Sequence, residues 1–505
     1  MRHTSRRQGV VSLGLAVAAC VLGAVLAVAG GQPGERRLQE AARRADADAV
    51  RVLITDGADV NARTGDGSTA LLWASYKDDL ASADLLIRAG ADVTLANDLG
   101  ATPIWAASRN GSAAMVETLL SAGADPDAPL LLGETPLVTA SRSGNSDVVR
   151  MLLERGADVN TRGARSQTPL MFAVAQRHPA VVAVLLEHGA EVDAVSDVWD
   201  QLMAQSPHAH PEHQMRVLRG GNTALMFAAR VGNLESARHL VAAGAHLDTP
   251  SAWGTTPLAI AAYSDFGEQF VIREETSRSL VYFDREQVLP GQFAELAAFL
   301  LEAGADPDAG AERFTPLIAA VLRQNDLLVG RLLDHSADPN MPLGDFTPHQ
   351  RGSTTDFFLH RSWVGASPLW LAARFSSPRI VRRLLQAGAE PGFVHHGVYY
   401  GGGAGGNLSP RREEVTTTLM AAVKMGAGRA WTVVPNDEAT VLESVTLLIE
   451  AGVDVTAVGS GVRLRRAPSR FPEPGHTALD GARSLEYESV VNFLIASSAD
   501  DTEAR

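Results

Sequence analysis

The stretch GETPLVTASRSGNSDVVRMLLERGADVN, Gly133 to Asn160, has the features of a helix–turn–helix unit. Thr135 can accept a hydrogen bond from an orphan backbone N–H, and Pro136 suits the first helical position, where no N–H is needed. Gly144 can take the left-handed turn that ends this helix. Ser146 is predicted to cap a second helix. The apolar residues of that helix share one stripe: Val148, Val149, Leu152 and Leu153.

The same landmarks recur along the chain at a fixed spacing of 33 residues. The threonines that follow this period are Thr69, Thr102, Thr135 and Thr168. The glycines that follow it are Gly57, Gly90, Gly123, Gly156 and Gly189. Later copies begin at wider, irregular gaps, with the cap residues Thr223, Thr256, Thr315, Ser367, Thr417 and Thr477. A period of this length predicts a repeat architecture.

This repeat resembles the ankyrin repeat family, from Leu38 to about Asp500. The resemblance implies an all-α fold, a curved solenoid of about eleven helix–turn–helix repeats with β-hairpin or loop fingers along one edge. Leu38–Asn61 is counted as a degenerate first copy without the threonine turn. The family often carries His after Thr-Pro-Leu, and that position here is mostly apolar, as in Leu72 and Trp105. We expect apolar contacts to replace the His-mediated link between neighbouring turns.

Departures from the regular spacing predict six insertions, all in the later repeats. They cover about 194–220, 264–292, 341–364, 391–415, 426–440 and 456–474. Four of them fall in the fingers, and the second and fifth fall between paired helices. Long loops on a compact scaffold are often functional. The finger insertions are therefore predicted to form the surface that selects a partner.

Aromatic residues in these insertions are the candidate partner-binding residues, because buried aromatic anchors often dominate interface energy. The candidates are Trp199, Phe357, Phe358, Trp363, Tyr399 and Tyr400. In the alternative interpretation, these side chains only pin the insertions to the solenoid. Trp73, Trp105 and Trp370 are instead expected to pack between repeats rather than to form a binding platform.

Two motifs point to other chemistry. HAHPEH offers His208, His210 and His213 as close imidazoles that could bind zinc or copper, so a metal- or small-ligand-binding protein is the alternative function. In the alternative interpretation, HAHPEH is a solvated or partner-facing loop without a metal. HHGVYYGGGAGG matches G-x-G-x-x-G at Gly401, Gly403 and Gly406, but Pro410 argues against a helix that begins at its third glycine. No metal, cofactor or catalytic residue is predicted, and the chain is not expected to be an enzyme.

The N-terminus has the pattern of a targeting segment. Arg2, Arg6 and Arg7 precede an uncharged apolar run over 10–29. A cleaved signal, an uncleaved inner-membrane anchor and a lipoprotein acylated at Cys20 all fit, and all place the rest of the chain in the periplasm or outside the cell. The predicted division is a signal peptide or anchor over 1–29, a linker over 30–37, the solenoid over 38–500 and a tail over 501–505.

Net charge and cysteine content limit the kinds of partner and site that the chain can have. The formal net charge is −14, which argues against nucleic acid, because that ligand needs a basic face. Cys20 is the only cysteine, so disulfides and cysteine-based sites are excluded. Membrane contact is expected only through the N-terminal segment. The sequence predicts an exported, bacterial-type ankyrin-repeat protein that serves as a protein-binding scaffold.

Overall fold

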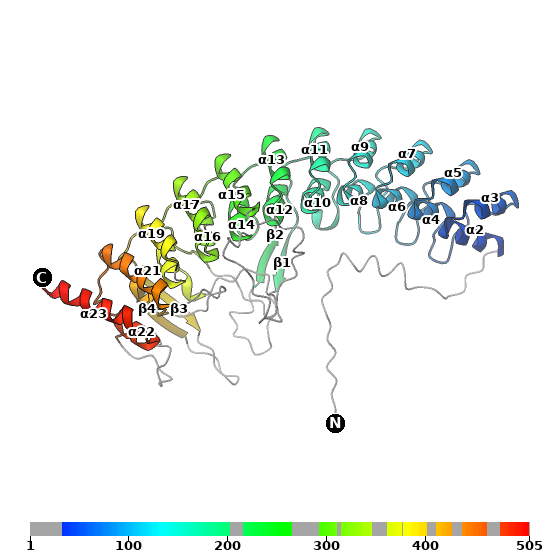
Figure 1. The fold of residues 1–505 in the computed structure, drawn as a ribbon. Coiled ribbons are helices and arrows are strands. Elements are labelled where there is room, and N and C mark those ends of the chain that lie inside the picture. The colour runs from blue at the N-terminus through cyan, green and yellow to red at the C-terminus, as the bar shows by residue number, and fades with distance from the viewer. Residues whose placement is uncertain are drawn as a thin grey trace, which may run out of the picture. The chain divides into compact units, whose positions relative to one another are not determined.

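The computed structural model describes residues 33–202, 216–264, 292–310, 315–345, 361–375, 377–400, 411–426, 437–461 and 475–503. The chain divides into two compact units, Met1–Asp158 and Val159–Arg505, here called the first and second units (Figure 1). Residues 1–32, which hold the predicted targeting segment, lie outside the described residues. Within the described part, no helix is both long and apolar enough to cross a membrane.

The first unit is a stack of four helix pairs. They are α2 (Pro33–Arg43) with α3 (Ala47–Thr55), α4 (Ala70–Lys77) with α5 (Leu80–Arg88), α6 (Pro103–Asn110) with α7 (Ala113–Ser121), and α8 (Pro136–Ser143) with α9 (Ser146–Glu154). Helices α4, α6 and α8 form an inner row, and the finger loops extend beyond it, away from α5, α7 and α9 (Figure 1). Helix α2 begins at Pro33, inside the segment predicted to be a linker.

The second unit adds seven helix pairs. They are α10 (Pro169–Ala175) with α11 (Pro179–Glu187), α12 (Ala224–Val231) with α13 (Leu234–Ala242), α14 (Pro257–Ser264) with α15 (Gln292–Glu302), α16 (Pro316–Arg323) with α17 (Asp326–Asp334), α18 (Pro368–Arg374) with α19 (Pro378–Gln386), α20 (Thr418–Ala422) with α21 (Glu438–Glu450), and α22 (Ala478–Leu485) with α23 (Glu488–Glu503). Helix α23 therefore runs into the predicted tail. Four pairs and seven pairs make the eleven repeats that the sequence predicts.

Each copy from the second onward begins with the predicted cap. In all ten copies the Thr or Ser hydroxyl oxygen accepts from the backbone N–H three residues later, at 3.2 to 3.4 Å. The prediction for the second helix of the quoted repeat is one residue off. Asn145 is the cap, since its Oδ1 accepts from the N–H of Asp147 and Val148, and Ser146 begins α9.

Apolar contacts do replace the histidine link. Leu72 and Trp105, each three residues after the capping threonine, share a buried cluster with Ala101 and Ala106. The equivalent Ile318 and Trp370 in the second unit are fully buried. The last copy differs, because Asp480 instead forms a capping box with the N–H and hydroxyl of Thr477. The core of each unit therefore lies between the paired helices and their neighbours.

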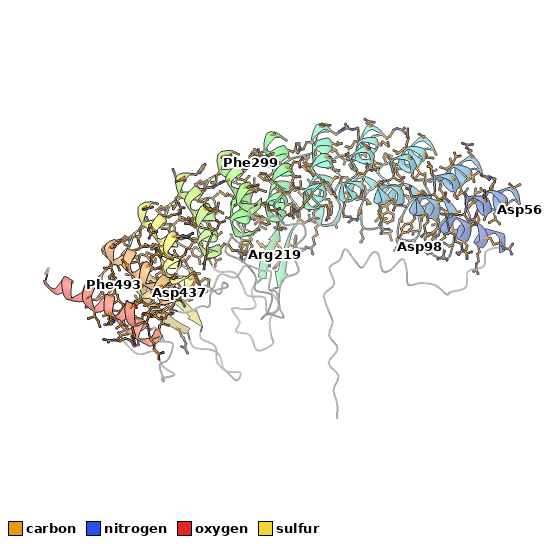
Figure 2. The ribbon with its side chains drawn as sticks, in the orientation of Figure 1. Asp56, Asp98, Arg219, Phe299, Asp437 and Phe493 are labelled. Carbon is orange, nitrogen blue, oxygen red and sulfur yellow. The ribbon has the colours of Figure 1, made fainter. Side chains whose placement is uncertain are left out.

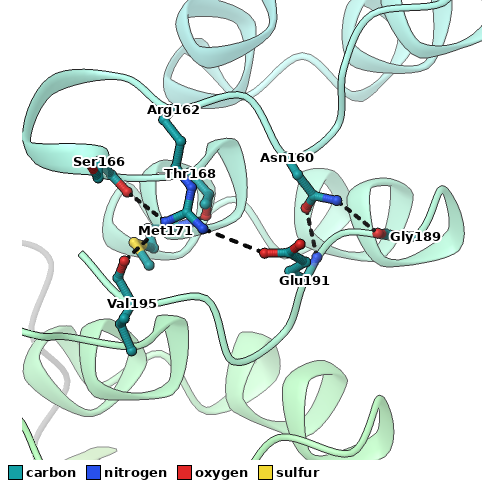
Figure 3. A network of polar contacts seen from close by, with 8 residues as sticks. All are labelled: Asn160, Arg162, Ser166, Thr168, Met171, Gly189, Glu191 and Val195. Atoms are coloured by element: carbon teal, nitrogen blue, oxygen red, sulfur yellow. Dashed lines mark hydrogen bonds and ion pairs between the residues drawn. The ribbon is translucent and has the colours of Figure 1, made fainter. Parts of the chain in front are cut away.

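Within each unit, an Asn or Asp side chain of one finger accepts a hydrogen bond from the backbone of the next finger. We call each such contact a rung. In Figure 3, the Asn160 amide donates to the Gly189 carbonyl at 3.4 Å and accepts from the Glu191 N–H at 2.8 Å. Nearby, Arg162 donates to the carbonyl of Val195 at 3.0 Å and lies 3.5 Å from the Glu191 carboxylate. The same rung position is held by Asn61, Asp127, Asp193, Asp248, Asp308 and Asn340. These contacts use backbone groups that the loops would otherwise leave unpaired.

Two of the predicted insertions contain β-hairpins. Strand β1 (Val198–Leu202) pairs antiparallel with β2 (Arg216–Gly220), and β3 (Val394–Tyr400) pairs antiparallel with β4 (Arg411–Thr417). The insertion over 456–474 extends the second hairpin, because Ser460 bridges Val415. Residues 265–291, 346–360 and 427–436, which make up most of the other three insertions, lie outside the described residues.

Candidate partner-binding surfaces

The inner row of the first unit carries a cluster of aromatic and cationic side chains, here called the aromatic platform: Trp73, Tyr76, Lys77, Trp105 and Arg109. Trp73 and Tyr76 come from α4 and meet edge to face, with ring centroids 5.9 Å apart. The Arg109 guanidinium, from α6, lies 5.3 Å from the Tyr76 ring centroid and 5.9 Å from that of Trp105. The Lys77 ammonium lies 5.9 Å from the Tyr76 ring. These are cation–π distances.

The two helices that present the platform are held together beneath it. The Asn110 side-chain amide, at the end of α6, donates to the Ser75 carbonyl at 3.1 Å and to the Tyr76 carbonyl at 2.9 Å. Trp105 is 9% exposed, which confirms that it packs between repeats. Its buried indole Nε1–H has no hydrogen-bond partner among the described residues. Trp73 is only half-buried, so packing alone does not account for it.

Three exposed leucines lie in the two fingers that precede α6 and α8, here called the leucine tip. Their exposed fractions are 51% for Leu99, 71% for Leu131 and 82% for Leu132. The Leu131 N–H donates to the Leu99 carbonyl at 3.1 Å, so two successive fingers meet here, beside Asp98 in Figure 2. Leu130 and Tyr76 both pack against the buried cluster around Trp105, which joins the tip to the platform. An exposed apolar patch with a polar rim is typical of an interaction site.

In the second unit, the β1–β2 hairpin offers a smaller surface. The half-buried ring of Trp199 is covered by the Arg165 guanidinium, which lies 4.0 Å from its centroid. Apolar side chains nearby are exposed, at 55% for Val198 and 51% for Leu218. Strand β2, marked by Arg219 in Figure 2, pairs Leu218 with Asp200. Trp199 is therefore partly accessible, in a finger as predicted, but one of its faces is occupied by an arginine.

The other predicted binding aromatics have different outcomes. Trp363 is 1% exposed and meets Phe375 edge to face at 5.2 Å, so its side chain belongs to the core, as the pinning interpretation expects. The backbone of Tyr399 and Tyr400 lies in β3, opposite Arg412 and Arg411. Phe357 and Phe358 lie outside the described residues. Their role in partner binding stays a prediction.

The base of the β3–β4 hairpin is tied to the solenoid by buried polar groups. The Trp370 Nε1–H donates to the Thr416 hydroxyl at 3.1 Å, and the His395 ring lies 4.6 Å from the Trp370 ring. His395 Nε2 lies 2.6 Å from the Ser362 carbonyl oxygen. Burial lowers the pKa of His395, the carbonyl contact opposes this shift, and the neighbouring His396 adds to it.

Strand β3 passes too close to its neighbours for any side chain at Gly397. A Cβ there would lie 2.9 Å from the Ser362 carbonyl oxygen and 2.9 Å from Cγ of Glu414. After α20, the Lys424 ammonium donates to the Arg374 carbonyl at 2.9 Å. Burial, together with the Arg374 charge, lowers the pKa of Lys424 to about 7. This cluster has the character of a packed anchor for the hairpin.

The two motifs that suggested other chemistry have different outcomes. The stretch before Gly401 is a strand, but the following element is the antiparallel strand β4, so the βαβ frame of a dinucleotide site is absent from the described residues around it. Among the described residues, no group of three or more His, Cys, Asp or Glu side chains could hold a metal ion. His208, His210 and His213 lie outside the described residues, so that hypothesis stays open.

The signals that would have revealed the first-unit surface were present in the sequence. Trp73 and Tyr76 are three residues apart, which places them on one helix face. The run Leu130–Leu132 interrupts a finger that is otherwise polar. The aromatic residues of the insertions are the stronger signal in the sequence, so the regular repeats are not predicted to bind a partner.

Comparisons with known proteins agree with the fold. The family model described as "Ankyrin repeats (3 copies)" matches residues 38–129 and 127–196, "Ankyrin repeats (many copies)" matches 212–261, and "Ankyrin repeat" matches 364–395. A solved structure, described as the crystal structure of the human ASB11 ankyrin repeat domain, is 30% identical, with a TM-score of 0.37; the match covers 44% of this chain and 89% of that one. No curated protein matches the chain. With eleven helix pairs and ten shared caps, the chain belongs to the ankyrin repeat family, whose repeats are protein–protein interaction domains.

Proposed function

We propose that this chain is a non-enzymatic scaffold that binds a protein partner through the aromatic platform and leucine tip of its first unit. The exposure of Leu131 and Leu132, at 71% and 82%, carries the proposal. Side chains of this kind gain free energy when a partner covers them, at about 25 cal/mol per Å² of apolar area. Aromatic and arginine side chains beside them are the residue types most enriched in interface hot spots.

The finger insertions of the second unit are a second part of the same proposal. Trp199 is retained because it is partly exposed in a hairpin. Phe357, Phe358, Tyr399 and Tyr400 are retained as sequence-based candidates. Trp363 is left out, because its side chain is buried against Phe375.

The location proposed for this function is outside the cytoplasm. The basic residues Arg2, Arg6 and Arg7 and the apolar run over 10–29 support it. Cell fractionation with a C-terminal epitope tag tests the location. Recovery of the chain from the periplasm, the medium or the membrane fraction supports it, and recovery of the full-length chain from the cytoplasm contradicts it.

Substitution at the tip tests the binding role. A partner is first isolated by cross-linking to the exported chain, and its affinity is then compared among variants. Leu131→Asp with Leu132→Asp should weaken binding at least tenfold, because two charges would be buried without partners. Val52→Asp is the matched control, since Val52 is 58% exposed on α3 of the same unit. Equal binding by the tip variant and the native chain would rule out the tip as the interface.

The finger candidates need their own comparison. Tyr399→Ala with Tyr400→Ala is measured for partner affinity and for melting temperature. Lost affinity with unchanged melting supports an interface role for the second-unit fingers. Lower melting with full affinity in the folded fraction means that these residues only hold the hairpin to the solenoid.

A further inference from the structure

We propose that the partner of the first unit presents an acidic segment, with apolar side chains on the leucine tip and a carboxylate on the aromatic platform. This inference rests on the proposed function and adds the chemistry of the ligand. It is drawn from the positions of Lys77, Arg109 and Trp105. Lys77 and Arg109 place two exposed cations over the rings of Tyr76 and Trp105.

Within the described residues, the two platform cations form no ion pair with a carboxylate. Arg109 and Lys77 are exposed, and the contacts found for them within the described residues are with aromatic rings. Several other exposed arginines of the first unit are paired with an acid. Arg88 lies 2.9 Å from Asp84, and Arg142 lies 2.5 Å from Glu134. The platform cations therefore remain available to an anion from outside.

The acidic residues nearest in sequence to Lys77 form no ion pair with it in the described structure. Asp78 and Asp79 directly follow Lys77, but Asp79 Oδ1 accepts from the Ser82 N–H at 3.1 Å and caps α5. Asp78 ends α4 in the left-handed conformation, with φ of 58°, and forms no ion pair with Lys77 in the described structure. The chain turns away from the platform at this point.

Trp105 supplies a separate indication of an acceptor. Its side chain is 91% buried, since 9% is exposed, yet its Nε1–H has no partner among the described residues. A buried donor without an acceptor is unfavourable. The same ring lies 5.9 Å from the Arg109 guanidinium. An incoming carboxylate can pair with that guanidinium, and it can satisfy the indole N–H only if the ring shifts to expose it.

The aromatic rings favour a carboxylate on a protein over a nucleic-acid phosphate. Stacking holds the Arg109 side chain near its bound position, which lowers the entropy cost of forming a directed, charge-assisted hydrogen bond. The leucine tip requires apolar side chains next to the anion, which a peptide can offer. A net charge of −14 repels a polyanion as a whole, whereas a few carboxylates on one segment face only the local cations.

A random peptide display library tests the proposal on the purified full chain. Selected peptides should combine Asp or Glu with Leu, Phe or similar side chains, and should be poor in Lys and Arg. Arg109→Gln should weaken the best selected peptide tenfold or more, because a charge-assisted bond contributes about 1.5–3 kcal/mol and about 1.4 kcal/mol corresponds to a factor of ten. Lys77→Gln should cause a smaller loss, since that ammonium lies over only one ring.

The controls separate local recognition from overall charge. Arg155→Gln removes the same charge from an exposed position after α9, and should leave peptide affinity within twofold. Arg109→Lys keeps the charge without the planar guanidinium and should recover only part of the affinity. Melting curves confirm that each variant is folded.

The outcomes distinguish this inference from the proposed function. Neutral peptides that need Leu131 and Leu132 but not Arg109 would overturn the carboxylate proposal and leave the binding surface intact. Acidic peptides that bind Arg109→Gln and Arg155→Gln equally would overturn it as well. Selected peptides that bind the Leu131→Asp, Leu132→Asp variant as tightly as the native chain would instead refute the proposed surface itself.

Discussion

Asp127→Asn should stabilise the first unit, because the rung that joins its third and fourth fingers carries an unfavourable charge. Both oxygens of the Asp127 carboxylate accept from the Asp158 N–H, at 3.2 and 3.1 Å. Burial raises the pKa of Asp127, the Asp158 N–H lowers it, and the nearby charges of Asp125 and Asp158 raise it further. The carboxylate is thus harder to ionise in the folded chain than in the unfolded chain.

The chain itself shows what asparagine does at the same position. Asn61, Asn160 and Asn340 accept from the next finger at 2.7 to 2.8 Å, and each also donates to a glycine carbonyl, at 3.1 to 3.4 Å. The Asp127→Asn variant would lose the repulsion, worth a few tenths of a kcal/mol, and could gain one partly exposed hydrogen bond. The expected gain is about 0.5–1 kcal/mol at neutral pH.

The pH dependence provides the sharper test. A carboxyl with a raised folded pKa destabilises the native state when it is ionised, and this penalty disappears once the carboxyl is protonated in both states. The advantage of Asp127→Asn should therefore shrink as pH falls through the carboxyl range, near pH 4. Asn160→Asp, the reverse change at another rung, should destabilise its own finger at neutral pH.

Hydrogen exchange at the Asp158 amide is the assay, because repeat proteins need not unfold in one step. Slower exchange in Asp127→Asn at neutral pH, by about two- to fivefold, is expected from the free energy above. Faster exchange, or an advantage that is independent of pH, would show that the charge on this rung is not the cause.

Three further changes test local parts of the fold. Thr135→Ala should cost about 1 kcal/mol in urea unfolding, and Thr135→Ser should cost little, because only the capping hydroxyl is needed; equal losses would contradict the capping role. Between pH about 7.5 and about 5, the protection factors in β3–β4, which are corrected for the slower intrinsic exchange at low pH, should fall. A lowered His395 pKa stabilises the fold at pH above the ordinary histidine pKa, and that stability is lost as pH falls; His395→Gln should abolish the dependence. Trp370→Phe should loosen the hairpin by about 1 kcal/mol through loss of the bond to Thr416, measured by exchange at the Thr416 amide, and unchanged exchange would show that this bond is not needed.

Much of the fold could be predicted from the sequence because its determinants are local. Each cap bond joins residues three positions apart, so the run from Thr135 to Val138 specifies it without knowledge of the rest of the chain. The period then places the same bond in every copy. Insertions leave the capped first turn of each repeat intact, so the irregular copies from Thr223 onward can also be recognised in the sequence.

The hairpins and the accessible surface depend on contacts that sequence spacing does not specify. The pairing of Val394 with Thr417 spans the whole insertion, and the contact of His395 with Ser362 joins two different insertions. An inserted segment rich in aromatic residues and histidine can be either a solvent-exposed loop or a packed one, so composition does not distinguish the two. Trp363 illustrates the point, since only its contact with Phe375 shows that it belongs to the core.

Insertions and regular repeats therefore have different roles, and aromatic content alone does not show which residues are buried and which are accessible. In the second unit, inserted residues such as Trp363 and His395 are nearly fully buried, so they contribute to the stability of the fingers they belong to. In the first unit, regular spacing leaves Trp73 and Tyr76 only partly buried on an inner helix face. A rigid face of this kind costs little entropy when a partner binds it. The plain repeats are consequently the better place to look for the first contact with a partner, and the decorated fingers for what distinguishes one partner from another.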